Sequence, residues 1–146
     1  MIKRKWIDEI IDGLVQSVGS DDIYDIASYL GLRIIKDNYI QNPLLKESKG
    51  FYIRSFNDKE IIVIRDDLED EKQIIAHELG HAVLHTDYDT LLHSMLSNRG
   101  KNEREANYFA TKLLYSDLEI EDGIETYKQL ADSLGLNEDN VKYIVD

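Results

Sequence analysis

The pattern of apolar and polar residues changes several times along the chain, and its first stretch has a helical period. Apolar side chains recur every three or four residues, which predicts an amphipathic helix over residues 2–18. Residues 20–22 then offer side-chain oxygens that can cap a second helix, and Gly31 follows its last residue, Leu30. We therefore expect two helices in this N-terminal part.

The next part of the chain has the alternation of β-strands. Residues 32–36 predict a short strand, and residues 37–49 are irregular and contain the only proline. Apolar and polar residues then alternate over 51–56 and again over 60–65, with the turn-forming residues 57–59 between them. These two strands are predicted to pair as an antiparallel hairpin.

Helical periodicity returns in the second half of the chain. Carboxylates at 66–70 can cap a helix over 69–85, and a polar loop over 87–101 leads to another helix over 102–115. Two short helices follow around Gly135. Separate helical and strand segments of this kind predict an α+β fold, with the hairpin packed against the helix at 69–85 and further helices flanking both ends.

Composition and charge narrow the function classes. A length of 146 residues suits one compact domain over 1–146. Hydrophobic content of 42% and charged content of 32% describe a soluble globular protein, and no segment approaches the roughly eighteen apolar residues that span a membrane. The 17 Lys and Arg against 29 Asp and Glu give a formal charge of −12. This charge repels nucleic acid phosphates, so a basic or neutral protein surface is the better partner.

The sequence also bears on location and on metal chemistry. Acidic residues at 8, 9 and 12 interrupt the apolar run that a signal peptide would need, so a cytoplasmic location is expected. The chain has no cysteine, which excludes disulfides and thiolate metal sites. Any metal ion would therefore depend on histidine and carboxylate side chains.

The motif HELGH at 77–81 concentrates such side chains on one helix. At about 100° per residue, one face carries three histidines and a glutamate, and the opposite face is apolar. These residues are His77, Glu78, His81 and His85. Two imidazoles at positions i and i+4 can converge on one tetrahedral ion, and Glu78 lies to the side, where a general base takes a proton from water. We expect this helix at the floor of a cleft.

A third ligand is expected from the next predicted helix. Ala106 and Ala110 lie at the centre of its apolar stripe, and Glu103 lies beside the stripe at the N-terminal end. Small residues at 106 and 110 allow a close approach to the HELGH helix. Asn107, on the same side as Glu103, can accept a hydrogen bond from a ligand imidazole. We predict Glu103 as the third ligand, with Glu105, which is turned further away, as the rival.

Each of these assignments has a less specific alternative. HELGH can arise by chance, and acidic residues such as Glu103 are common in the first turn of any helix. His85 could assist the site or donate to a backbone carbonyl near the end of its helix, and we favour this structural role. Five further side chains could stabilise an oxyanion, although a packing or surface role is more common for each. They are Tyr52, Tyr88, His93, Tyr108 and Tyr115.

Two motifs in this order resemble a known family. The resemblance is to the ImmA/IrrE family of zinc metallopeptidases, and it is carried by AHELGHAVLH followed by EREANYFATKLL. The preceding GFYIRSFNDKEIIVIRDDL is similar to the glycine-led hairpin of that family, and the likeness covers about residues 50–115. It implies a small zincin-like fold with Glu78 as catalytic acid/base. It also implies that Zn²⁺ is held by His77, His81 and Glu103.

The resemblance further implies a class of substrate. Members of the ImmA kind are encoded by phages and mobile elements and relieve repression by cutting a repressor with a helix-turn-helix domain. The implied function is a zinc endopeptidase of narrow specificity that holds its substrate along strand 51–56 or strand 61–65. The alternative is a zinc-containing regulatory protein that binds a transcription factor without hydrolysis, since some IrrE-type members act as regulators in stress responses.

Two features of the sequence limit what the resemblance implies. Where the family commonly reads Leu-Leu-Met-Pro after the ligand helix, this chain has Leu-Leu-Tyr-Ser at 113–116, which changes one expected wall of the cleft. Residues 129–136 hint at a helix-turn-helix, but Glu138 and Asp139 begin the following helix, where phosphate contacts would be wanted. Direct binding to nucleic acid is therefore not expected.

Overall fold

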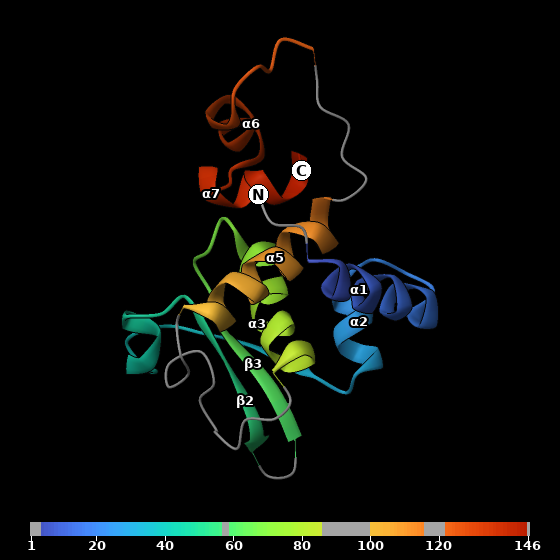
Figure 1. Cartoon of the computed structure of the whole chain (residues 1–146). Coiled ribbons are helices and arrows are strands. Elements are labelled where there is room, and N and C mark those ends of the chain that lie inside the picture. The colour runs from blue at the N-terminus through green and yellow to red at the C-terminus, as the bar shows by residue number, and fades with distance from the viewer. Residues whose placement is uncertain (1–3, 57–58, 86–99, 116–121, 146) are drawn as a thin grey trace.

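The computed structural model describes residues 4–56, 59–85, 100–115 and 122–145. Within these ranges the chain forms six α-helices and a three-stranded sheet, which confirms the predicted α+β class (Figure 1). The elements, in chain order, are α1 (Lys5–Val18), α2 (Ile23–Tyr29), β1 (Arg33–Asp37), the short 3-10 helix η1 (Pro43–Lys46), β2 (Gly50–Phe56), β3 (Lys59–Arg65), α3 (Glu71–Leu84), α5 (Lys101–Tyr115), α6 (Tyr127–Leu134) and α7 (Glu138–Val145). Most of the loop predicted at 87–101 lies outside the described residues.

Helix capping follows the sequence at α2 but not at α3. The side chain of Asp22 accepts hydrogen bonds from the backbone N–H groups of Tyr24 and Asp25, at 2.8 and 3.1 Å. At α3 the N-cap residue Asp70 makes no such bond. Its carboxylate pairs instead with the ammonium group of Lys49 at 3.1 Å, so the prediction of side-chain capping was wrong at this helix.

The sheet contains the predicted hairpin and one pairing that the sequence did not indicate. Strands β2 and β3 pair antiparallel, with Phe51 opposite Val63, which confirms the hairpin. Strand β1 pairs parallel to β3 on its other side, with Ile35 opposite Val63, so the sheet is mixed and has the order β1-β3-β2. The apolar run at 61–64 is buried throughout, as expected for a central strand covered on both faces.

The two faces of the sheet pack against different partners. Tyr52, Ile62 and Ile64 belong to the main core, together with Ile75 and Leu79 of α3. The alternate positions form a second cluster on the other face, which includes a residue of η1. Its buried members are Leu45, Phe51, Ile61 and Val63. Because successive side chains of a strand point to opposite faces, this division follows from the period-two pattern.

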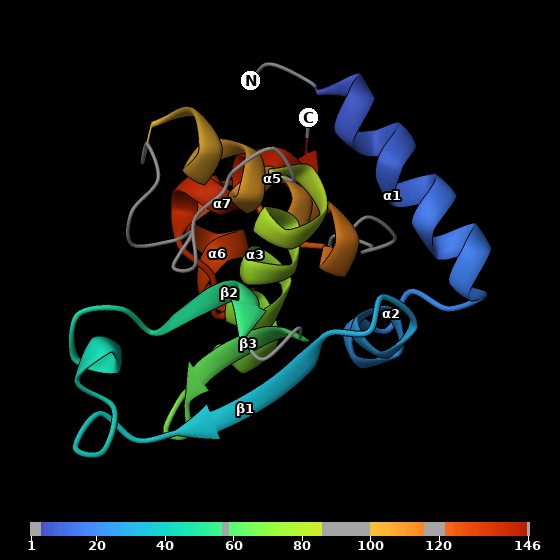
Figure 2. The same cartoon turned by 90° about the horizontal axis from the view of Figure 1, so that it is seen from below.

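Helix α3 lies between the sheet and α5 (Figure 2). Its contact with α5 is close, because a Cβ at Gly80 would come within 3.2 Å of the Cα of Ala106. Ala106 and Ala110 are fully buried, as the expected close approach requires. This packing brings the first turn of α5 over the histidines of α3.

The last two helices pack against each other. They share a small apolar cluster formed by Leu130, Ala131 and Val141, and α7 packs against α5. Helix α6 is capped by Thr126, whose side chain accepts a hydrogen bond from the backbone N–H of Gln129 in a capping box. None of the helices in the described ranges is long and apolar enough to cross a bilayer.

Candidate metal centre

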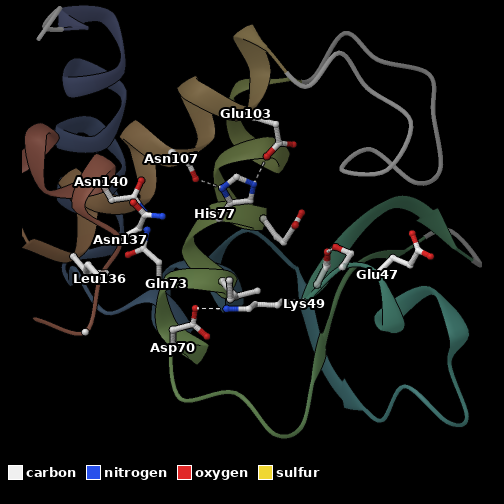
Figure 3. Close-up of a pocket in the computed structure, with 15 residues that line it drawn as sticks. Glu47, Lys49, Asp70, Gln73, His77, Glu103, Asn107, Leu136, Asn137 and Asn140 are labelled. Atoms are coloured by element: carbon white, nitrogen blue, oxygen red, sulfur yellow. Dashed lines mark hydrogen bonds and ion pairs between the residues drawn. The ribbon is translucent and has the colours of Figure 1, made fainter. Parts of the chain in front are cut away.

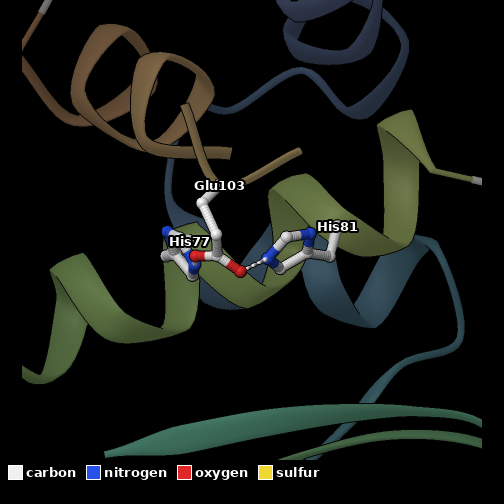
Figure 4. A group of neighbouring side chains, drawn as sticks. All are labelled: His77, His81 and Glu103. Atoms are coloured by element: carbon white, nitrogen blue, oxygen red, sulfur yellow. Dashed lines mark hydrogen bonds and ion pairs between the residues drawn. The ribbon is translucent and has the colours of Figure 1, made fainter. Parts of the chain in front are cut away.

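Three side chains from two helices meet where the start of α5 crosses α3 (Figure 4). The Nε2 atoms of His77 and His81 lie 2.8 and 3.1 Å from the two carboxylate oxygens of Glu103. The two imidazole rings are nearly perpendicular, with centroids 4.8 Å apart. One donor atom from each of the three residues lies within 4.8 Å of the others.

The donor set fits a small divalent cation. Bonds of about 2.0–2.1 Å to a tetrahedral Zn²⁺ would place its ligand atoms about 3.3 Å apart. The distances of 2.8 and 3.1 Å between the histidine nitrogens and Glu103 are close to this separation. Two imidazoles and one carboxylate also leave a coordination position for water or substrate, as catalytic sites do.

A hydrogen bond to Asn107 fixes the orientation of His77. The Oδ1 atom of Asn107 lies 2.7 Å from the Nδ1 atom of His77, which is the contact that the sequence predicted. Since an amide oxygen only accepts, His77 donates from Nδ1, which leaves Nε2 as the nitrogen that would bind a metal ion.

The charges of the three residues are coupled. Burial alone would raise the pKa of Glu103, but hydrogen bonds from His77 and His81 outweigh it and hold this pKa well below its usual range. Burial lowers the pKa of His77, yet its hydrogen bond to Glu103 and the charge of Glu78 produce a net rise. For His81 burial prevails and the pKa is lowered. The lowered pKa values of Glu103 and His81 favour the charged carboxylate and the neutral imidazole that metal ligation requires, whereas the raised pKa of His77 favours its protonated form, from which a metal ion would displace the proton.

A cavity of about 490 Å³ opens beside this cluster. His77, Glu78 and Glu103 line it, and Glu78 is 2% exposed. Figure 3 shows Asn137 and Asn140, from the start of α7, on one side of the cavity. The residues from Glu47 to Gly50, which lead into β2, line it as well.

The polar face of α3 is less open than expected. His81 is completely buried and does not line the cavity, because α5 covers this part of the face. Only the half of the face nearer the N-terminus, with His77 and Glu78, reaches the cavity. The expected cleft floor is therefore confined to one turn of the helix.

Glu105 and His85 contact each other outside the cluster. Glu105 stands apart from the cluster, and its Oε1 atom lies 3.0 Å from Nε2 of His85. The other ring nitrogen of His85 lies 2.9 Å from Nδ1 of His81. Both ring nitrogens thus face side chains, so the expected donation from His85 to a backbone carbonyl was wrong.

None of the oxyanion candidates within the described residues lines the cavity. Tyr52 is buried and its hydroxyl donates to Glu60, and burial raises its pKa. Tyr108 is buried against α1, where its hydroxyl donates to Asp8 at 2.9 Å. Tyr115 lines a neighbouring hollow. Two further candidates, Tyr88 and His93, lie outside the described residues.

Sequence reasoning missed the part of the cavity wall that α7 supplies. Asn137 and Asn140 lie sixty or more residues beyond His77, and no local pattern marks them as part of a site. In the structure the beginning of α7 faces the cavity instead of standing free.

Comparison with known proteins gives the following matches. The family model of the IrrE N-terminal-like domain, Peptidase M78, matches residues 27–138. The chain is 29% identical to metallopeptidase ImmA of Bacillus subtilis (strain 168) over 116 residues, which cover 77% of this chain and 65% of that protein. It is 32% identical to uncharacterized immunity region protein 2 of Bacillus phage phi105 over 110 residues, 73% of this chain and 66% of that one. The chain thus spans just under two thirds of the length of either relative. No solved structure matches.

Proposed function

The chain belongs to the IrrE N-terminal-like (Peptidase M78) family, and from this premise we propose that it is a zinc-dependent endopeptidase of narrow specificity. Family membership confirms the resemblance to ImmA and IrrE that the sequence motifs indicated. The observation that carries the proposal is the convergence of His77, His81 and Glu103 beside Glu78 at the wall of a cavity.

The proposal assigns His77, His81 and Glu103 as ligands of Zn²⁺. Two imidazoles and a carboxylate are a common ligand set of catalytic zinc. When bound, the ion supplies Lewis acidity, which polarises a carbonyl group and lowers the pKa of water. We further propose a zincin-like fold and a single catalytic domain over 1–146, located in the cytoplasm, where a repressor would be met.

Glu78 is proposed as the general base and acid. It follows His77 on the same helix, is nearly excluded from solvent and lines the cavity. From this position its carboxylate can take a proton from the attacking water and transfer it to the leaving amine. Such a group typically contributes 100- to 10,000-fold to the rate, in order of magnitude.

Strand β2 is proposed to hold the substrate in an extended conformation. Of the two strands considered from sequence, β3 is paired on both sides and has no free edge. Strand β2 has only β3 as its partner among the described strands, and its first residue, Gly50, lines the cavity. A substrate strand added to β2 would run between this edge and the start of α7. An adjoining hollow of about 910 Å³, which shares Lys49, Asp70 and Gln73 with the first, provides room for its continuation.

The proposed substrate is a helix-turn-helix repressor. One relative is named for a phage immunity region, and the other is a metallopeptidase named ImmA. A net charge of −12 favours a basic partner, as DNA-binding proteins are. The start of α7 faces the cavity, which argues against the use of α6 and α7 for direct DNA recognition.

The variant Glu78→Gln separates hydrolysis from binding. Purified wild-type protein with Zn²⁺ is expected to cleave a repressor encoded beside its gene, whereas Glu78→Gln should keep the metal and lose cleavage. Metal content and repressor fragments are measured on the same samples. If Glu78→Gln relieves repression in cells as well as the wild type does, the non-hydrolytic regulator is the correct alternative. A gel shift at physiological salt checks for direct DNA binding, and none is expected.

A further inference from the structure

A second line of contacts runs from His81 away from the cavity. The Nδ1 atom of His81 lies 2.9 Å from Nδ1 of His85, and Nε2 of His85 lies 3.0 Å from Oε1 of Glu105. The other oxygen of Glu105 lies 4.0 Å from the guanidinium of Arg4, just before α1. His81, His85 and Glu105 are 0%, 4% and 4% exposed. A buried carboxylate is costly unless it is paired, so its place beside His85 calls for an explanation.

Proton positions along this line can be ordered in only two ways when His85 is neutral. In the first, His81 donates from Nδ1 to Nδ1 of His85, and His85 donates from Nε2 to Glu105. The Nε2 atom of His81 then keeps its lone pair for a metal ion shared with Glu103. In the second, both imidazoles take the other tautomer, so His81 carries a proton on Nε2, where the metal would bind.

Glu105 excludes the second arrangement. A charged carboxylate only accepts hydrogen bonds, and in the second arrangement the Nε2 atom of His85 that lies 3.0 Å from it would carry no proton. Two acceptors facing each other in a buried position are strongly disfavoured. In the first arrangement the unprotonated Nε2 of His81 lies 3.1 Å from Oε1 of Glu103, and a metal ion held between these two atoms would satisfy both. With that ion in place, only the first arrangement satisfies His81, His85 and Glu105.

We propose that His85 and Glu105 are positioning residues that hold His81 in the tautomer that presents Nε2 to the metal. This inference rests on the metal centre of the proposed function, but it does not depend on hydrolysis. The two ligand histidines are then supported differently, because His77 donates to the neutral amide of Asn107, whereas His81 is linked through His85 to a charge. A carboxylate behind a ligand imidazole also makes that imidazole a better donor to the metal.

The test is the Zn²⁺ affinity of the full chain, measured by competition with a chromophoric chelator at one pH. Glu105→Gln keeps the size of the side chain, but its amide can also donate, so the second arrangement is no longer excluded. The expected loss of affinity is roughly 10- to 100-fold. Asp8→Asn is the matched control. It removes a carboxylate that also contacts α5, but this contact is with the hydroxyl of Tyr108 and not with an imidazole. Its affinity should equal that of the wild type.

The outcomes separate this inference from the proposed function. If Glu105→Gln binds Zn²⁺ as tightly as the wild type while Glu103→Gln binds weakly, the metal centre stands and the positioning role is overturned. If the wild type binds no more tightly than Glu103→Gln, the metal centre itself is wrong, and the inference falls with it.

A second measurement does not require any variant to fold. Nitrogen-15 NMR of the Zn²⁺-loaded wild type reports which ring nitrogen of each histidine carries a proton. The expected result is a proton on Nδ1 of His81 and on Nε2 alone of His85. A proton on Nδ1 of His85 would overturn the proposal whatever the variants do.

Discussion

Gly80 of α3 and Ala106 of α5 are in backbone contact, since a Cβ at residue 80 would come within 3.2 Å of the Cα of Ala106. The same added carbon would also lie 3.2 Å from the ring of Phe109. This contact sets the separation of the two helices at the point where Glu103 reaches His77 and His81. The glycine of HELGH therefore serves the candidate metal centre through helix packing.

Gly80→Ala is expected to weaken metal binding even though alanine is the better helix former. The added methyl group must push α5 outward by a few tenths of an ångström, which moves Glu103 away from the histidines. We expect a loss of Zn²⁺ affinity of roughly tenfold, the lower end of what a misplaced ligand costs. Chelator competition measures it.

Gly13→Ala provides the control for this change. Gly13 lies in α1, and nothing stands within 4 Å of a Cβ placed there. The variant should gain up to about 1 kcal/mol of helix stability with no change in metal affinity. Equal metal affinities for Gly80→Ala and Gly13→Ala would show that the close approach is unimportant for the site.

Replacement of Asn107 is expected to release His77. In Asn107→Leu the Nδ1–H of His77 loses its acceptor, so the ring is free to rotate or to take the other tautomer. The expected cost is roughly 10- to 100-fold in Zn²⁺ affinity, as for other residues that orient metal ligands. Metal content after dialysis against a chelator gives the measurement. Retention of metal at the wild-type level would mean that packing alone holds the ring.

Asn140 tests the part of the cavity that α7 supplies. Its side chain lines the cavity, but it is not among the residues that contact the imidazoles in the described structure. Asn140→Ala is expected to raise the KM for the repressor severalfold and to leave kcat and metal affinity unchanged, because it removes binding that substrate and transition state share. An unchanged KM would place the substrate elsewhere, and a loss of metal would show a structural effect.

Local patterns predicted the elements of this fold, and long-range packing supplied what they could not. Periodicity identified the helices and the hairpin, and the spacing of His77 and His81 depends only on helix geometry. The parallel pairing of β1 with β3 joins segments almost thirty residues apart, and no turn residue specifies it.

The candidate site divides in the same way. The apolar stripe of α5 indicated that Glu103 and Asn107 share a side, and the structure places both beside His77. The apolar stripe did not indicate that His85 would contact Glu105, because that contact depends on the crossing of α3 and α5. The sequence pattern also could not show that the start of α7 would line the cavity, since α7 is positioned by its packing on α6 and α5.

Tyr108 connects α5 to α1 and gives a prediction about pH. Its buried hydroxyl donates to Asp8 at 2.9 Å and accepts from the backbone N–H of Arg4 at 3.2 Å. Burial raises the pKa of Tyr108 to about 12 from its ordinary value of 10.0, the bond from Arg4 opposes this rise, and the bond to Asp8 adds to it. A group whose pKa is raised by folding stabilises the folded state fully below its unfolded pKa and loses this contribution as the pH rises through its folded pKa. The window for Tyr108 is therefore about pH 10 to 12.

Tyr108→Phe should remove this contribution. At pH 8 the variant is expected to have a free energy of unfolding about 1 kcal/mol lower than the wild type, because Asp8 and the N–H of Arg4 lose their partner. Between pH 10 and 12 the two proteins should converge, since the wild type then loses what the variant already lacks. Urea unfolding at several pH values measures the difference, and Tyr29→Phe, at an exposed position, should match the wild type throughout. A constant difference across this range would show that Tyr108 is not the group that titrates.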